Sequence, residues 1–161
     1  MSDLKRVYEF EVNYLPFELA PNMPKEGKDQ KEHLAEKFGG EGKFRQLTAH
    51  VAAVAAGEGL HFDYSKQQKT PNTRDAHRLI WLAKKEGVQG QVKEALLNAF
   101  FEKGIDLTKD ENLVDIVAEA GLDLLPEQPC LGSAYLISIF FVFSFFSTFT
   151  FGIVRYKIPS L

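Results

Sequence analysis

The sequence contains a single cysteine, Cys130, in 161 residues. One thiol excludes an intramolecular disulfide and any metal site built from several cysteines. The sequence also lacks a strong excess of either charge, because a quarter of its residues are charged and the formal net charge is only −3. It therefore lacks the basic footprint of a nucleic-acid-binding domain, and we expect no nucleic-acid partner.

The N-terminus lacks the pattern of a secretory signal. Five of its first residues are charged, and they leave no room for an apolar core of about seven or more residues. We therefore predict a cytoplasmic protein, and the alternative is anchoring to a membrane through the C-terminal tail. The charged residues are Asp3, Lys5, Arg6, Glu9 and Glu11.

Charge is almost absent from the end of the sequence, where Arg155 and Lys157 are the only charged residues after Glu127. The run from Leu131 to Val154 would measure about 36 Å as a helix, against about 30 Å for the core of a membrane. Three interpretations of this tail stay open: a transmembrane helix, buried strands, or an ending foreign to the domain, such as the product of a shifted reading frame.

The rest of the chain is predicted to be mainly helical, with one strand. Residues 7–15 (VYEFEVNYL) alternate between apolar and polar side chains as in a half-buried strand, which ends at Pro16. After the strand, apolar residues recur every three or four positions, for example at Phe44, Leu47, Val51 and Val54. This period predicts five amphipathic helices, over about Asp29–Phe38, Phe44–Gly57, Asn72–Gly87, Val92–Gly104 and Thr108–Gly121.

Two of these helix starts carry capping signals. Asn72 can accept a backbone N–H of the first turn, where Asp75 suits the positive end of the helix dipole. Thr108 and Glu111 have the spacing of a capping box.

No residue is predicted to be catalytic, to bind a metal or to hold a cofactor. The four histidines (His33, His50, His61 and His77) include no pair at helical metal-binding spacing, and Cys130 has no basic neighbour that would activate its thiol. Serine-hydrolase, P-loop and dinucleotide motifs are absent. His77 lies near a helix N-terminus, where the dipole would lower its pKa and favour a neutral, hydrogen-bonding imidazole; its alternative is an ordinary packed histidine.

Several stretches together are similar to one family. They resemble DsbA-like thioredoxin-fold proteins of the FrnE type, which are dithiol–disulfide oxidoreductases or isomerases. The matching stretches are residues 15–24 (LPFELAPNMP), 33–39 (HLAEKFG), 71–79 (PNTRDAHRL), 100–106 (FFEKGID) and 118–123 (AEAGLD).

The resemblance implies a partial thioredoxin domain over residues 1–123, with a thioredoxin strand at 7–15 and a helical insertion at 29–121. Residues 124–161 are then an apolar tail, with membrane contact through 131–154 as a hypothesis. The fold class is mainly α, and α/β by ancestry. Proteins with thiols or disulfides are the implied partners.

The family's reactive C-x-x-C motif and its cis-proline strand are both missing from this sequence. We therefore expect no thiol–disulfide exchange by this chain, and no catalytic residue is transferred from the family. Asn72, Thr73 and His77 are the candidate substrate-binding residues.

Two alternatives stay open. Glutathione-dependent isomerases of the kappa-transferase type share this architecture, and a cap at Asn72 and Thr73 would fit their substrate-side helix. The chain could also be a non-enzymatic helical interaction module tethered to a membrane by its tail.

Overall fold

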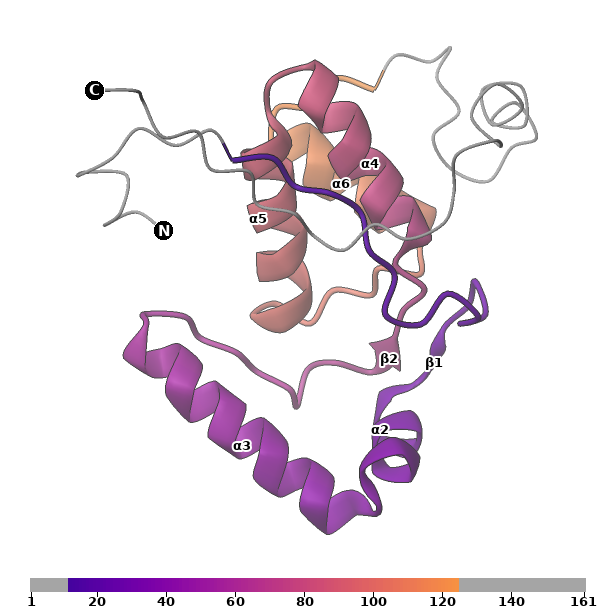
Figure 1. Ribbon diagram of the computed structural model, residues 1–161, viewed down its shortest axis with the longest axis vertical. Coiled ribbons are helices and arrows are strands. Elements are labelled where there is room, and N and C mark those ends of the chain that lie inside the picture. The colour runs from indigo at the N-terminus through magenta and orange to yellow at the C-terminus, as the bar shows by residue number, and fades with distance from the viewer. Residues whose placement is uncertain (1–11, 125–161) are drawn as a thin grey trace, which may run out of the picture.

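The computed structural model describes residues 12–124. In this part the protein is mainly helical, as predicted, with five helices and one short antiparallel pair of strands (Figure 1). The predicted tail, Cys130 and most of the predicted strand lie outside the described residues. The elements in chain order are β1 (Lys28–Asp29), α2 (Gln30–Phe38), α3 (Glu41–Gly57), β2 (Lys69–Thr70), α4 (Arg74–Lys85), α5 (Gln89–Phe101) and α6 (Asp110–Glu119).

The core lies between α4, α5 and α6. The apolar residues that recur every three or four positions in these helices face one another and are removed from water. The prediction of the buried faces is confirmed here, because Leu79, Val92 and Val117 are all fully buried. The other large, fully buried side chains are Leu113 and Leu122.

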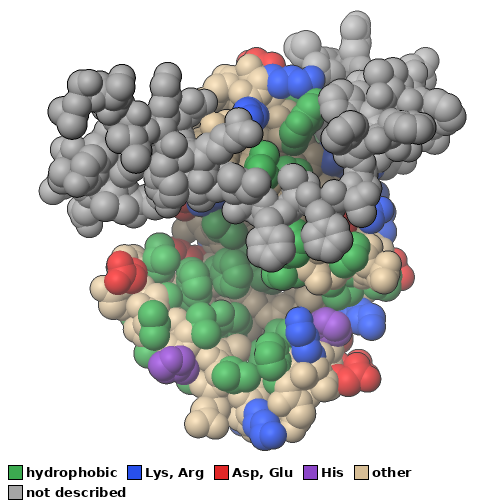
Figure 2. Space-filling model, in the orientation of Figure 1, with side chains coloured by type: hydrophobic (Ala, Val, Ile, Leu, Met, Phe, Trp, Pro, Cys, Tyr) green, Lys and Arg blue, Asp and Glu red, His purple; other side chains and the backbone are tan. Residues whose placement is uncertain are grey.

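The α2–α3 pair lies apart from this bundle (Figure 1). Its helix boundaries agree with the sequence: the Asp29 carboxylate accepts the Glu32 N–H at 2.9 Å, and Gly39 ends α2 with φ +80°. Its apolar face is less covered than the period suggests. Phe44 is buried, but Leu47, Val51 and Val54 are 43–58% exposed. Figure 2 shows hydrophobic side chains on the lower part of the molecule, where Figure 1 places α3.

Polar and aromatic contacts connect the two regions. Gln30 and Gln67 are buried and joined by a side-chain hydrogen bond, and the Gln67 amide also donates to the Phe100 carbonyl at 3.2 Å. The ring of Phe62 stacks on that of Phe101, with their centroids 4.7 Å apart. The segment between α3 and β2 is thus attached to the end of α5.

Two local predictions are wrong in the described residues. Residues 12–15 of the predicted strand are not part of a strand, and the Tyr14 backbone exchanges two hydrogen bonds, of 3.0 and 3.2 Å, with the Gln89 side-chain amide. The capping box also fails, because the Thr108 hydroxyl donates to Asp106 at 2.7 Å and α6 begins at Asp110 without a side-chain cap.

Candidate functional site

The predicted substrate-binding residues Asn72, Thr73 and His77 lie together at the start of α4. Asn72 uses both of its amide atoms: Nδ2 donates to the Met23 carbonyl at 2.5 Å, and Oδ1 accepts the Arg74 backbone N–H at 2.9 Å. Asn72 therefore shields a first-turn N–H as predicted, although Thr73 occupies the N-cap position. Since the same side chain holds the segment before β1 against α4, a ligand could bind Asn72 only by displacing one of these bonds.

Glu18 and Arg74 belong to this cluster, and the sequence analysis did not single them out. Arg74 Nε donates to Glu18 Oε1 at 3.2 Å, and a guanidinium N–H donates to the Pro21 carbonyl at 3.4 Å. The second carboxylate oxygen of Glu18, Oε2, is buried and has no hydrogen-bond partner in the described part of the chain. A buried acceptor without a donor is unfavourable, and this oxygen has almost no solvent-accessible surface, so a ligand could reach it only if the surrounding segment moved. Both residues lie in stretches that resemble the DsbA-like family (residues 15–24 and 71–79). This resemblance was the only feature of the sequence that could have pointed to them.

His77 is half-buried one turn into α4. Burial lowers its pKa below the ordinary value of 6.5, while the negative charge of Glu18 and a hydrogen bond with the Phe17 backbone act in the opposite direction. The predicted direction agrees with this result, but the largest cause is loss of solvent rather than the helix dipole. A neutral imidazole at pH 7 can donate one hydrogen bond and accept another.

Thr73 is the most accessible of the three candidates. Its carbonyl accepts the His77 backbone N–H at 3.0 Å, and its exposed hydroxyl makes no capping hydrogen bond. Thr73 and His77 can therefore offer acceptors and donors to a polar ligand. No cluster of three or more metal-binding side chains (His, Cys, Asp or Glu) occurs in residues 12–124.

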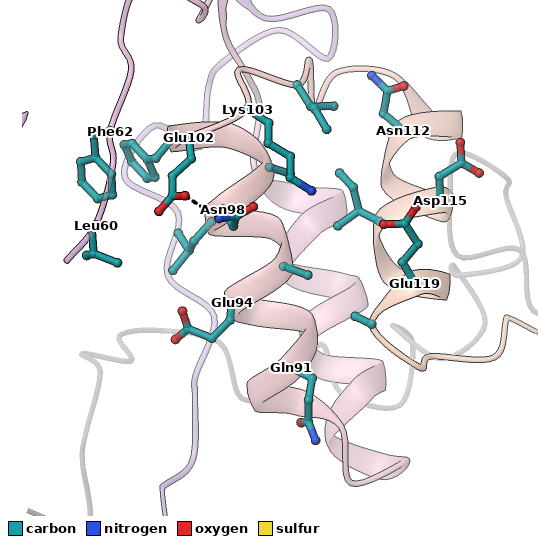
Figure 3. Close-up of a pocket in the computed structure, with 17 residues that line it drawn as sticks. Leu60, Phe62, Gln91, Glu94, Asn98, Glu102, Lys103, Asn112, Asp115 and Glu119 are labelled. Carbon is teal, nitrogen blue, oxygen red and sulfur yellow. Dashed lines mark hydrogen bonds between the residues drawn. The ribbon is translucent and has the colours of Figure 1, made fainter. Parts of the chain in front are cut away.

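A groove of about 890 Å³ lies between α5, α6 and the segment after α3 (Figure 3). Its lining is partly apolar and carries more acidic than basic side chains, with Lys103 beside Glu94, Glu102, Asp115 and Glu119. Asn98 donates to Glu102 at 2.8 Å across one turn of α5. The sequence analysis missed this groove because its residues come from three separate segments. The apolar lining includes Leu60, Phe62, Leu97, Phe101, Ile105 and Ile116.

The profile of the DSBA-like thioredoxin domain matches residues 1–127. The chain belongs to this family. A solved relative, the crystal structure of a probable DsbA oxidoreductase from Streptomyces coelicolor, is 30% identical with a TM-score of 0.62. The match covers 66% of this chain and 47% of that one, so the DsbA-like chain spans about half the length of its solved relative. No curated protein matches the sequence.

Family membership supports thiol–disulfide chemistry as the family's general activity, with protein thiols as the general class of substrate. In this DsbA-like chain the described residues contain no cysteine, since Cys130 lies outside them. None of the helices in residues 12–124 is long and apolar enough to cross a membrane.

Proposed function

We propose that this chain is the helical part of a FrnE-type dithiol–disulfide oxidoreductase and that the polypeptide with this sequence does not itself catalyse disulfide exchange. The observation that carries the proposal is the cysteine content, because Cys130 is the only thiol in a chain that belongs to the DSBA-like family. Disulfide exchange proceeds when a thiolate attacks a disulfide sulfur and forms a mixed disulfide. A second thiol must then resolve this intermediate, and the sequence has none.

The cluster at the start of α4 then serves the substrate side of such an enzyme. The exposed Thr73 hydroxyl and the neutral His77 imidazole are suited to the peptide groups of a protein substrate. Proteins with thiols or disulfides are the proposed partners, and the cytoplasm is the proposed location.

Reduction of insulin by dithiothreitol, followed by turbidity, tests the proposal. The full chain should leave the rate at the level measured without protein, and a Cys130→Ser variant is the matched control. A rate well above this level that Cys130→Ser abolishes would contradict the proposal, because it would show that one thiol is sufficient for turnover.

A relationship to kappa-type glutathione-dependent isomerases is supported less well. It relied on Asn72 and Thr73 as residues that face a substrate, but both amide atoms of Asn72 are bonded within the chain. Glutathione-agarose should therefore not retain the protein. Specific elution by free glutathione would favour the isomerase relationship instead.

The membrane-tethered module rests on residues 131–154, which lie outside the described residues, and on the absence of recognisable catalytic motifs from the sequence. Alkaline carbonate extraction of membranes from expressing cells tests it. Release of the chain into the supernatant would exclude an integral anchor, while retention that is lost when residues 128–161 are deleted would support one.

A further inference from the structure

An exposed apolar stripe runs along α3. Leu47, Val51 and Val54 are spaced by four and three residues, so they lie on one face of the helix, and they are 45%, 43% and 58% exposed. Phe44 and Ala55 are the buried residues of α3, and they border the stripe on the same side of the helix. The α2 helix packs on α3 and leaves the stripe itself open. The stripe has the spacing of a helix–helix seam, but no other described residue covers it.

Charged side chains of opposite sign stand at the two ends of this stripe. Lys43 is one turn before Leu47, and Glu58 is one turn after Val54. Within residues 12–124, neither Lys43 nor Glu58 forms an ion pair. The stripe is therefore apolar in the middle, positive at its first end and negative at its last.

Two copies of α3 that pack against each other in antiparallel orientation would have complementary charges at both ends of the stripe. In an antiparallel pair with a two-fold axis between His50 and Val51, Leu47 of one copy faces Val54 of the other, and Lys43 faces Glu58. Each contact then occurs twice, as symmetry requires. A parallel pair would instead place Lys43 beside Lys43 and Glu58 beside Glu58, which is unfavourable.

We propose that a second copy of this chain covers the stripe, so that the protein forms a two-fold dimer through antiparallel packing of α3 on α3. We assign the stripe to a second copy because, in an antiparallel pair, Lys43 of each copy lies opposite Glu58 of the other. A single helix pair buries less surface than a standard interface, so the dimer is weak and forms reversibly at micromolar concentrations or above. This proposal is independent of the proposed function, because it uses neither Cys130 nor the α4 cluster.

Sedimentation equilibrium of the full chain tests the proposal, for example over about 1 µM to 1 mM. The weight-average mass should rise from the monomer mass of 18.2 kDa toward twice that value. Leu47→Glu should hold it at the monomer mass, because each copy would bury a carboxylate without a partner. Val114→Glu is the matched control, because Val114 is also exposed but lies on α6; it should associate like the unmodified chain.

A monomer at every concentration would overturn the proposal and leave the α3 stripe to a partner of another kind. Association that Leu47→Glu does not weaken would overturn it too, because the association would then use another surface. Circular dichroism should show equal helix content in the unmodified chain and in both variants. If Leu47→Glu loses helix content, its effect on association cannot be separated from unfolding. The charge-exchange variants described next then test the proposal, because they replace only exposed charged side chains.

Charge exchange tests the antiparallel register. Lys43→Glu and Glu58→Lys should each weaken association about 3- to 10-fold, since each replaces two attractive pairs with two repulsive ones. The double variant K43E/E58K should return to within about 2-fold of the unmodified chain, because the pairs are restored with their signs exchanged. Weakening that is additive in the double variant would overturn the proposed packing.

Discussion

The α4–α6 bundle and the α2–α3 pair are built from helices of the same amphipathic type, but they are stabilised in different ways. In the bundle, five large side chains are fully buried, among them Leu79, Val92 and Val117. In the α2–α3 pair the buried residues are Gln30, Phe44 and Ala55, and one of these three is polar. An apolar period therefore shows which side of a helix can be buried, but not whether a neighbour is present to bury it.

The connection between the two regions includes a buried polar pair and a close backbone approach, beside the stacked rings of Phe62 and Phe101. Gln30 and Gln67 are paired beside the short β1–β2 ladder, and Gly104 lies against Lys66 in the segment that leads to β2. Hydrogen bonds are directional and apolar contacts are not, so these contacts define where the pair sits more than they add to stability. We expect substitutions in the bundle to change global stability most and those in the α2–α3 pair to act locally.

The largest effect is expected in the bundle core. Leu79→Ala should lower the free energy of unfolding by about 2–5 kcal/mol, because it leaves a cavity among fully buried side chains. Leu47→Ala on α3 should cost less than about 1 kcal/mol, because Leu47 is 45% exposed. Urea denaturation followed by circular dichroism measures both. Equal losses of unfolding free energy in the two variants would show that α3 contributes as much buried apolar packing as the α4–α6 bundle.

A smaller loss is expected where the two regions meet. Gly104 has φ +69°, and an added Cβ would lie 2.8 Å from the Lys66 carbonyl carbon. Gly104→Ala should therefore cost about 2–4 kcal/mol, from backbone strain and from displacement of this segment. Gly87→Ala has a similar φ of +74° but open space around the new Cβ, and it should cost only about 1–2 kcal/mol. Thermal or urea unfolding measures both variants. Equal losses of stability would show that the close approach of Gly104 to Lys66 adds nothing to the cost of backbone strain.

The buried glutamine pair should have a local effect. Gln67→Ala leaves the Gln30 amide buried without this partner, which costs about 1–3 kcal/mol. Hydrogen exchange should then quicken at α2 amides while α5 amides near Leu96 remain protected. Gln68 is the exposed neighbour of Gln67, so Gln68→Ala is the control. It should change neither the free energy of unfolding nor the exchange rates of the α2 amides. Faster exchange throughout α5 would show that the two regions unfold together.

The smallest effect is expected from pH. Because burial lowers the pKa of His77 in the folded state, the unfolded chain binds its proton first as the pH falls. The stabilising contribution is present above about pH 6.5 and is lost below it, until the pH reaches the folded-state pKa. His77→Gln should flatten the stability curve over that interval. In an NMR titration, Glu18→Gln should lower the His77 pKa further, whereas Glu26→Gln should not; an unchanged value in Glu18→Gln would remove Glu18 as a cause.

The helices of this protein were predictable from the sequence because they depend on local features. The side chain of Asp29 accepts a first-turn N–H, Gly39 ends α2 with a positive φ, and the apolar period of α4 identifies Leu79 as buried. Residues 12–15 could not be predicted in the same way. Their alternation is that of a strand, but strand pairing needs a partner, and at Tyr14 the side chain of Gln89, 75 positions away, takes that place.

The candidate site was predictable in part. The motif PNTRDAH led to Asn72, Thr73 and His77, and these residues do lie together at the start of α4. The contributions of Glu18 and Arg74 depend on a fold that brings them together over 56 positions, as does the burial that dominates the His77 pKa. Sequence spacing can place a group on a helix, but its solvent exposure and its charged neighbours come from other segments.

The sequence by itself determined much of the local structure: the start and end of α2, the apolar faces of α4, α5 and α6, the family, and the single thiol that limits disulfide chemistry. These follow from contacts within a few residues or from composition. Only the tertiary structure decided which apolar faces are covered, that the Glu18 carboxylate meets Arg74 and His77, and that α3 keeps an open stripe. Burial and electrostatic coupling depend on distances between segments far apart in the chain, and those distances are set only when the helices pack.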